Sequence, residues 1–251
     1  RVNGGFYYML GSVFLNAGPF QLKETNMVNI KNLSFGFDKP ILKDINLKIV
    51  HHGQVIALLG PNGSGKTTLM NVVADLYQKY LGTIKDRGSV FFLPDHSYIP
   101  EDLTINECLE LFESVYSTFN KDKAIQILKY LNLDKNKSIS AYSKGMKEQL
   151  HLVFLLSQDA DTYLLDEPLA AVDPLTRDIL IDLIIRFKNE KSITIISTHL
   201  VQDMEKLFDE VVFMREGKVI LYNTVEQLLN EFSHMSLDDI YKEVNRNVIV
   251  D

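Results

Sequence analysis

The sequence predicts an α/β fold: a core sheet of buried strands covered by helices, a small antiparallel β subdomain and a helical subdomain. A glycine-rich loop stands between an apolar strand pattern at residues 55–59 and a helical pattern that starts at Leu69. Two further runs, 163–165 and 193–197, are apolar throughout, which is expected of strands with helices on both sheet faces. The hydrophobic pattern changes to the helical period over residues 104–133, and this change predicts the helical subdomain.

The remaining strand patterns lie on either side of this core. Residues 28–35 and 41–49 alternate between apolar and polar side chains, which predicts half-buried strands for the antiparallel β subdomain. A short buried strand is expected over residues 89–93. Residues 211–222 predict a hairpin whose turn lies at Gly217.

Helix signals predict where the helical segments begin and end. The helix after the glycine-rich loop is expected to run to about Tyr80 and to end at residues 81–83. Thr104 and Glu107 match the first and last positions of a capping box. Short helices are expected from Val225 onwards. Two buried stripes are predicted between residues 104 and 133; their members are Ile105, Leu109, Leu111 and Phe112, then Ala124, Ile125, Leu128 and Leu131.

The chain divides into three predicted segments. Residues 1–26 carry no period that continues into the fold, and we expect an appended extension or a loosely docked tail. Residues 27–225 form the main domain, with a helical subdomain at about 95–150, and residues 226–251 form C-terminal short helices. Glycine, asparagine and proline interrupt the apolar stretch at residues 6–20, which is also too short to span a bilayer.

Composition narrows the possible functions. The chain has 251 residues with 46% hydrophobic content, ample for a sizeable core. Its formal net charge of −7 disfavours nucleic acid as a partner, because a phosphate backbone needs a basic protein face. Cys108 is the one cysteine, so no disulfide can form within the chain and a reducing compartment fits. No group of histidines and cysteines has the spacing of a zinc site.

Residues 60–67 match the phosphate-binding P-loop pattern G-x-x-x-x-G-K-[ST], and they lie between a strand and a helix as that pattern requires. The three glycines of the loop are expected to adopt positive φ and to aim backbone N–H groups inward. Lys66 would reach the β- and γ-phosphates of ATP, and the Thr67 hydroxyl would ligate Mg²⁺. A glycine-rich turn without a ligand is the alternative. The predicted nucleotide-binding residues of this loop are Gly60, Asn62, Gly63, Ser64, Gly65, Lys66, Thr67 and Thr68.

Two carboxylates, Asp166 and Glu167, follow the buried run 163–165. Ligands of open parallel sheets lie beyond the carboxyl ends of the strands. Asp166 is therefore predicted to hold Mg²⁺ beside Thr67. Glu167 is predicted to orient and deprotonate the water that attacks the γ-phosphate. The alternative is that both carboxylates only cap the helix that follows.

Ser143 opens a helical pattern that becomes strongly apolar over residues 150–156. Serine is a favoured N-cap residue, and simple helix capping explains its presence. A hydroxyl together with the free backbone donors of a helix start can also bind an anion. The pattern alone leaves both interpretations open.

These motifs together resemble the ATP-binding (nucleotide-binding domain) subunit of bacterial ABC transporters, and the order of elements agrees over nearly all of residues 27–225. The run Tyr142-Ser143-Lys144-Gly145-Met146 resembles the family signature L-S-G-G-Q. Ser143 and Gly145 match that signature, whereas Lys144 and Met146 depart from it. The form of the run is similar to that of bacterial exporters for drugs, peptides and lantibiotics.

The resemblance assigns roles to four further residues. Asp173 matches the aspartate of the family's D-loop, although it also suits the N-cap of a helix that starts at Pro174. His199 resembles the histidine that senses the γ-phosphate. Phe37 lies where the family stacks an aromatic ring on adenine, with packing on the core as the alternative. Asp95 replaces the Q-loop glutamine and would reach Mg²⁺ through a water. The predicted catalytic set is Lys66, Glu167 and His199.

The resemblance implies an ABC ATPase fold, a P-loop NTPase core, with ATP and Mg²⁺ as cofactors. Two such subunits, identical or different, would close head to tail. Each ATP would lie between one P-loop and the other subunit's helix that begins at Ser143. A separate multi-helix membrane permease would dock on residues 95–140. The chain would then be a peripheral subunit on the cytoplasmic face of the cell membrane, and its transporter would export a drug, peptide or lipid-like substrate.

Two other functions remain open from the sequence. One is an ABC-type ATPase that acts in DNA repair or translation, which a single P-loop, no sustained heptads and a net negative charge disfavour. The other is a regulatory pseudo-ATPase that binds ATP without turnover. The departures at Asp95 and Lys144 motivate it, and Glu167 and His199 argue against it.

Overall fold

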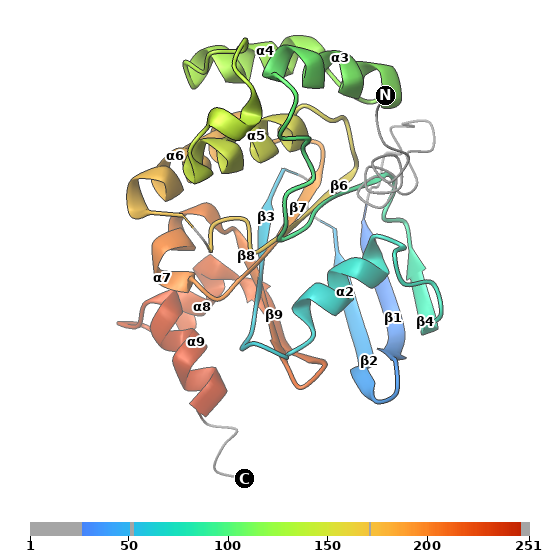
Figure 1. Ribbon diagram of the computed structural model, residues 1–251. Coiled ribbons are helices and arrows are strands. Elements are labelled where there is room, and N and C mark those ends of the chain that lie inside the picture. The colour runs from blue at the N-terminus through green and yellow to red at the C-terminus, as the bar shows by residue number, and fades with distance from the viewer. Residues whose placement is uncertain (1–26, 51–52, 171, 247–251) are drawn as a thin grey trace.

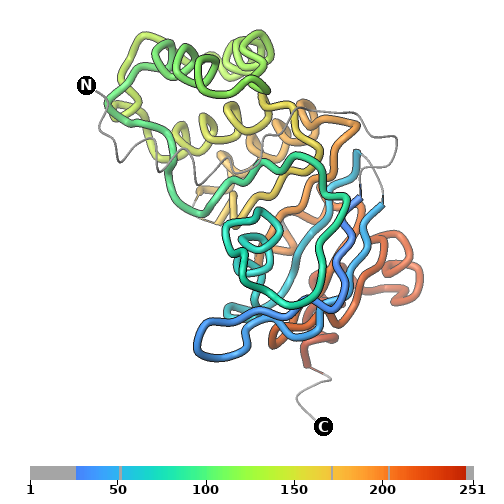
Figure 2. The backbone as a smooth tube through the Cα atoms, turned by 90° about the vertical axis from the view of Figure 1, so that its right-hand side faces the viewer, coloured from blue at the N-terminus to red at the C-terminus, as the bar shows by residue number. Residues whose placement is uncertain are grey.

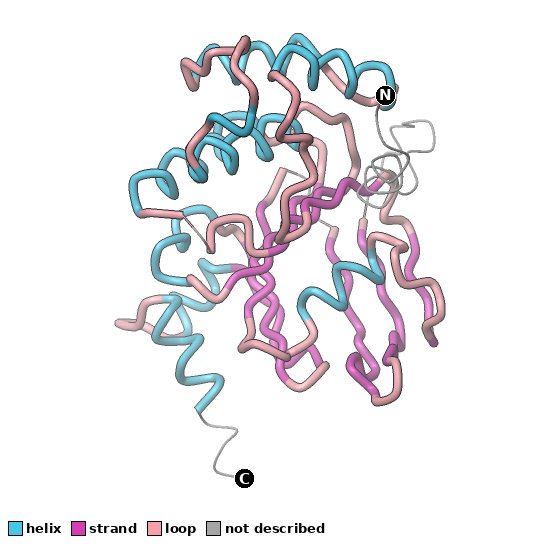
Figure 3. The backbone as a smooth tube through the Cα atoms, in the orientation of Figure 1, coloured by secondary structure: helices cyan, strands magenta, loops and turns pink. Residues whose placement is uncertain are grey.

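The computed structural model describes residues 27–50, 53–170 and 172–246. Two sheets and their helices form a body with a helical layer at one end and the strands at the other (Figure 1). Figure 3 shows most helices on one side of the larger sheet, with α2 and the smaller sheet on the other. The predicted tail at residues 1–26 lies outside the described residues.

The larger sheet is the predicted core. In the described residues its strand order is β5-β6-β7-β3-β8-β9. The strands from β5 to β8 in that order pair in parallel, and β9 returns antiparallel to β8. The parallel strands are almost wholly buried, as expected where both sheet faces are covered. Their bounds are β3 Val55–Leu59, β5 Val90–Leu93, β6 Thr162–Asp166, β7 Ile193–Thr198, β8 Glu210–Arg215 and β9 Lys218–Thr224.

The smaller sheet is antiparallel, with the order β2-β1-β4. The strands β1 Val28–Gly36 and β2 Pro40–Ile49 agree with the predicted alternation. The third strand, β4 Leu81–Lys85, was not predicted, since its first residues were expected to end a helix. Leu81 pairs instead with Ser34 of β1. The side chains of β4 are mostly exposed, so its sequence has no strand pattern. The strand forms because β1 supplies hydrogen-bond partners for its backbone.

The helix after the glycine-rich loop, α2 Lys66–Val73, is shorter than predicted. Asp75 adopts the left-handed conformation, with φ of 67°, which ends the helix directly after Ala74. The apolar side chains Leu76, Tyr77 and Tyr80 pack from a loop against the core of the smaller sheet.

Each strand of the larger sheet contributes to two cores. On β3, Val55, Ala57 and Leu59 face the core shared with the helical layer. Ile56 and Leu58 face the core shared with α2 and the smaller sheet. This period of two follows from the pleat of a strand. The glycine-rich loop thus begins at the end of a strand held from both sides.

Three helices make up the predicted helical subdomain: α3 Ile105–Val115, α4 Lys121–Tyr130 and α5 Lys144–Leu156. Figure 2 shows them stacked at the end of the molecule opposite the β1–β2 hairpin. The capping box at the start of α3 is confirmed: Glu107 N donates to Thr104 Oγ1 at 3.2 Å, and Thr104 N donates to Glu107 Oε2 at 2.7 Å. One stripe member is wrong, because Ile125 is 37% exposed and Ile127 is buried in its place.

The remaining α-helices are α6 Pro174–Phe187, α7 Val201–Met204, α8 Val225–Glu231 and α9 Leu237–Arg246. Of these, α6 packs against α5, and α8 packs against β9 and α9. The hairpin turn lies at Glu216-Gly217, as predicted. None of the helices in the described ranges combines the length and apolar character that a membrane crossing requires.

Candidate nucleotide site

The glycine-rich loop connects β3 to α2 and turns around the carboxyl end of the sheet. Gly63 and Gly65 have φ values of 80° and 102°, as predicted. The prediction for Gly60 is wrong, because its φ is not positive. A Cβ at Gly60 would lie 2.4 Å from the Met214 carbonyl oxygen and 2.6 Å from Ser64 Oγ. Glycine is needed at this position for close packing rather than for a left-handed turn.

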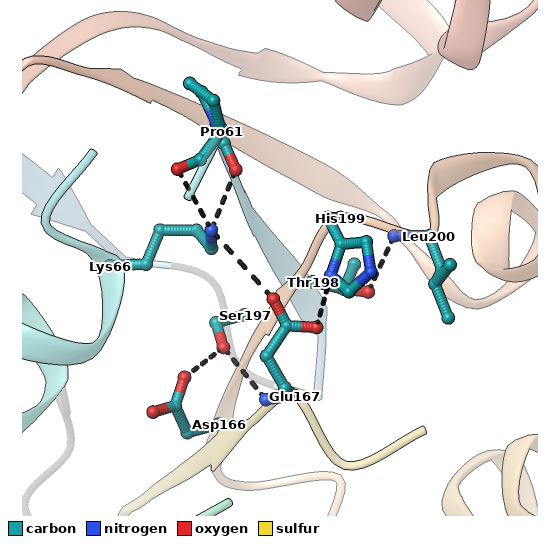
Figure 4. Close-up of polar contacts among 9 residues, drawn as sticks. Pro61, Lys66, Asp166, Glu167, Ser197, Thr198, His199 and Leu200 are labelled. Carbon is teal, nitrogen blue, oxygen red and sulfur yellow. Dashed lines mark hydrogen bonds and ion pairs between the residues drawn. The ribbon is translucent and has the colours of Figure 1, made fainter. Parts of the chain in front are cut away.

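Lys66 is buried at the centre of the site, with 6% of its surface exposed. Its Nζ donates to the Gly60 carbonyl oxygen at 2.7 Å and lies 3.9 Å from Glu167 Oε1 (Figure 4). Burial lowers the pKa of Lys66, while the carboxylates of Glu167 and Asp166 oppose that shift. The ammonium is thus held by loop carbonyls and one carboxylate at the bottom of the loop.

The end of β6 carries Asp166 and Glu167, and the adjacent end of β7 carries Ser197. Ser197 Oγ donates to Asp166 Oδ1 and accepts a bond from Glu167 N at 2.9 Å (Figure 4). Glu167 adopts a φ of 47°, which turns its side chain away from the strand direction. Sequence reasoning did not single out Ser197, although the predicted parallel pairing would have brought a hydroxyl at that strand end beside the two carboxylates.

His199 follows β7 by one residue and lies beside Glu167. Its Nδ1 is 3.0 Å from Glu167 Oε2, and its ring side chain is 47% exposed. The structure therefore brings the three predicted catalytic side chains together, with Glu167 between Lys66 and His199 (Figure 4). A carboxylate held by two cationic or hydrogen-bonding partners has a fixed direction.

A cavity of about 560 Å³ opens over the loop. Ser64 is 2% exposed, and within the described residues its Oγ has no hydrogen-bond partner. A buried hydroxyl of this kind fits a ligand that supplies oxygen acceptors. The cavity is lined by Ile41, Asn62, Gly63, Ser64, Gly65, Lys66, Thr67, Thr68, Asp95 and Glu167.

Two predicted residues line other cavities. Asp166 is 1% exposed and, with Asp95 and Glu167, lines a cavity of about 40 Å³ behind the carboxylates. Phe37 is 68% exposed and lines a separate cavity of about 650 Å³ formed by the β1–β2 hairpin and residues 79–81. Its ring meets those of Phe35 and Tyr77 edge-on, at centroid distances of 5.2 and 5.4 Å.

Three other predicted residues lie at helix starts outside these cavities. Ser143 caps α5 by accepting a bond from Met146 N at 3.3 Å. Asp173 caps α6 by accepting bonds from Thr176 N at 3.0 Å and Thr176 Oγ1 at 2.7 Å, and these bonds lower the pKa of Asp173. Gly145 packs against the same threonine, since a Cβ on Gly145 would lie 2.7 Å from Thr176 Oγ1. The helix-capping interpretation therefore holds for both Ser143 and Asp173.

The donor set suits magnesium better than a self-contained metal site. Among the described residues, no group of three or more His, Cys, Asp or Glu side chains is arranged to hold a metal ion. Mg²⁺ commonly takes one or two protein oxygens and completes its shell with phosphates and water. The oxygens of Thr67 and Asp166, on either side of the site, fit that requirement in kind.

A family model described as "ABC transporter" matches residues 42–170, which is more than half of the chain. The chain belongs to the ABC transporter family. It is an ATP-binding subunit of that family, an ATPase whose core is the ABC ATPase domain. The match runs from β2 through the glycine-rich loop to just beyond Glu167, so it contains the loop and the carboxylate pair.

Curated relatives of this ABC subunit agree over most of its length. It is 27% identical to the uncharacterized ABC transporter ATP-binding protein MJ1023 of Methanocaldococcus jannaschii, over 88% of this chain and 86% of the relative. It is 27% identical to the ABC-type transporter ATP-binding protein EcsA of Bacillus subtilis, over 88% and 97%. It is 32% identical to the lantibiotic transport ATP-binding protein SrtF of Streptococcus pyogenes, over 84% and 98%.

Solved structures share the fold of this ABC subunit. One described as the structure of an ATP binding subunit of an ABC transporter superposes with a TM-score of 0.74 at 25% identity. The superposition covers 87% of this chain and 99% of that chain. A nucleotide-free ATP-binding cassette superposes with a TM-score of 0.71 at 18% identity, which speaks for the fold alone.

Proposed function

We propose that this ABC subunit hydrolyses ATP to power the export of a drug, peptide or lipid-like substrate through a separate membrane permease. The observation that carries the catalytic part is Glu167, placed between Lys66 and His199 at the edge of the loop cavity. The export part is supported by the run at residues 142–146 and by the similarity to SrtF, which is named for lantibiotic transport.

In the proposed mechanism the loop holds the phosphates and Glu167 activates water. Lys66 and the backbone N–H groups at the start of α2 neutralise the β- and γ-phosphates of ATP. The Glu167 carboxylate takes a proton from the water that attacks the γ-phosphate. His199 holds Glu167 in direction through the 3.0 Å contact and stabilises charge that develops on the γ-phosphate. Through its single hydroxyl, Ser197 holds the carboxylate of Asp166 and the backbone N–H of Glu167.

Magnesium belongs to the same proposal. Thr67 and Asp166 would hold the ion, and Asp95 would contact it through a water. When bound, Mg²⁺ supplies positive charge that offsets the charge of the triphosphate. The same positive charge would offset the repulsion between the phosphates and the Asp95 side chain, which lines the cavity.

The capped helix starts are proposed to act across a subunit interface. Ser143 and Asp173 are exposed and lie outside the loop cavity of their own chain. A second subunit, identical or different, would bring its own ATP against Ser143 and Gly145, with Asp173 close by. ATP would stabilise the closed pair because it supplies negative charge to both faces, and loss of the γ-phosphate would weaken it. Phe37 would stack on adenine from the neighbouring cavity.

The proposed place of the chain is the cytoplasmic face of the cell membrane, bound to a permease. The test is an affinity pull-down from detergent-solubilised membranes with Glu167→Gln and ATP present. Recovery of a multi-helix membrane protein supports the transporter assignment, and that partner's identity narrows the substrate class. Recovery of soluble repair or translation proteins alone would overturn it. Glu231→Gln, on the exposed end of α8, is a matched control that keeps turnover.

A further inference from the structure

A buried histidine on α5 contacts the chain segment that leads away from β5. His151 is 6% exposed. Its Nε2 lies 3.1 Å from Ser97 Oγ, and its Nδ1 lies 3.2 Å from Glu148 Oε2. Both ring nitrogens are therefore engaged, one by the segment after β5 and one by the preceding turn of α5 itself. A buried imidazole with both nitrogens paired has one fixed orientation.

Tyr98 strengthens the same contact in two further ways. Its ring stacks on the His151 ring with centroids 5.1 Å apart and an interplanar angle of 27°. Its hydroxyl donates to the His151 carbonyl oxygen at 2.9 Å. Burial raises the pKa of Tyr98 well above its usual value, so the hydroxyl remains a donor. We call the three residues Ser97, Tyr98 and His151 the clamp.

The clamp lies directly behind the catalytic carboxylates. Asp95, two residues before the clamp, lines both the loop cavity and the smaller cavity of about 40 Å³. His151 and Glu148 line that smaller cavity together with Asp166 and Glu167. The ladder of β5 ends at Leu93, and within the described residues the segment from Pro94 to Ser97 pairs with no strand. The connection runs alongside α5 on its way to α3 (Figure 1).

We propose that His151 is a positioning residue for ATP hydrolysis: by holding Ser97 and Tyr98 it fixes where Asp95 lies against the site. The proposal rests on the proposed catalytic function of Glu167 and its neighbours. It assigns no contact between His151 and the nucleotide. The contacts of His151 connect α5, which begins at Ser143, with the segment that carries Asp95, so a shift of either would displace the other.

The first experiment compares turnover and ATP binding in variants of the full chain. His151→Leu keeps most of the volume and removes both polar contacts, and it should lower kcat about tenfold while the Kd for ATP changes less than about twofold. His151→Gln should retain most of the turnover, because an amide can still bond Ser97. Ser97→Ala, at an exposed position, should lower kcat in the same direction. Ser114→Ala removes a hydroxyl bond to Leu111 O on α3 and is the matched control.

The decisive comparison uses the Asp95→Ala background. When one residue acts through another, the free-energy effects of the two substitutions are not additive. When two residues act independently, the fold-changes in kcat from the two substitutions multiply. If His151 acts through Asp95, adding His151→Leu to Asp95→Ala changes kcat no further. A full additional loss in the double variant would overturn the proposal, as would a His151→Leu variant with unchanged kcat.

A second measurement keeps the clamp separate from the catalytic assignment. Amide hydrogen exchange of peptides covering residues 94–98 should be faster in His151→Leu and in Ser97→Ala than in wild type or Ser114→Ala. Unchanged exchange in both variants would contradict the clamp. If wild type shows no ATP hydrolysis but the exchange rates rise as expected, the catalytic function fails and the clamp stands.

Discussion

The loop cavity and the paired starts of α5 and α6 differ in how much of their proposed chemistry lies within one chain. At the edge of the cavity, Glu167 contacts both Lys66 and His199. At the helix starts, Ser143 and Asp173 are satisfied by bonds to their own helices and lie exposed. The comparison teaches that a complete set of contacts marks a site that one chain can organise. The contacts of the capped, exposed helix starts show capping alone, so their proposed role depends on a second subunit.

The largest expected effect tests the first half of that comparison. Glu167→Gln should lower ATP turnover by at least about hundredfold, because an amide cannot accept the proton of the attacking water. ATP binding should persist, since the loop and Lys66 are unchanged. Turnover and equilibrium ATP binding are measured on the same preparation, with Glu231→Gln as control. A Gln variant that hydrolyses as fast as wild type would show that another group is the base.

A smaller loss of turnover is expected from Ser197→Ala. This hydroxyl bonds the Asp166 carboxylate and the backbone N–H of Glu167. Its removal leaves that carboxylate and that backbone segment free to shift, so kcat should fall about tenfold. The control is Ser140→Ala, which removes a surface hydroxyl bonded to Ser138. Equal turnover in Ser197→Ala and Ser140→Ala would mean that the cavity tolerates loose carboxylates.

The second half of the comparison is tested by Gly145→Ala. Its Cβ would lie 2.7 Å from Thr176 Oγ1 and 3.0 Å from Thr176 Cγ2, so the α5–α6 contact must open. The expected loss is about 1–2 kcal/mol in the free energy of unfolding, measured by urea denaturation. Lys144→Ala, one residue earlier on α5 and exposed, is the matched control.

The double variant Gly145→Ala/Thr176→Ala sharpens that test. Truncating the threonine removes the two atoms in conflict, so the pair should cost less than the sum of its single changes. Additive losses would mean that Gly145 is required for a reason other than its contact with Thr176.

The smallest effect concerns Asp173. Bonds from Thr176 lower its pKa in the folded state, so the carboxylate's contribution is complete above the unfolded pKa of about 3.9 and is lost as the pH falls through the folded pKa. The difference in the free energy of unfolding between wild type and Asp173→Asn should therefore shrink as the pH falls below about 4. Asp38→Asn, in the exposed β1–β2 hairpin, is the control. A difference that stays constant with pH would contradict capping by the ionised form.

The sequence correctly predicted those features that depend on consecutive residues. The glycine-rich loop, the strand that ends at Asp166 and the capping box at Thr104 are local patterns with local physical causes. The family and fold followed from their order and were confirmed by the comparisons. The roles proposed for the individual site residues remain predictions.

What sequence reasoning missed depends on contacts between distant segments. The strand β4 forms because it pairs with the edge of β1, and the sequence Leu81-Gly82-Thr83 contains no signal for that pairing. Gly60 must lack a side chain because the carbonyl oxygen of Met214, a residue distant in the sequence, lies against it. Ser197 gains its importance only once β6 and β7 lie in register. Each of these three features depends on a residue that is close in space but distant in the sequence, and a local sequence pattern does not identify that residue.

The two-sided burial of β3 has a mechanical consequence. Val55, Ala57 and Leu59 belong to one core, Ile56 and Leu58 to the other, and the glycine-rich loop follows at once. A shift of the helical layer relative to the smaller sheet would therefore change the packing on a face of β3, directly before the glycine-rich loop.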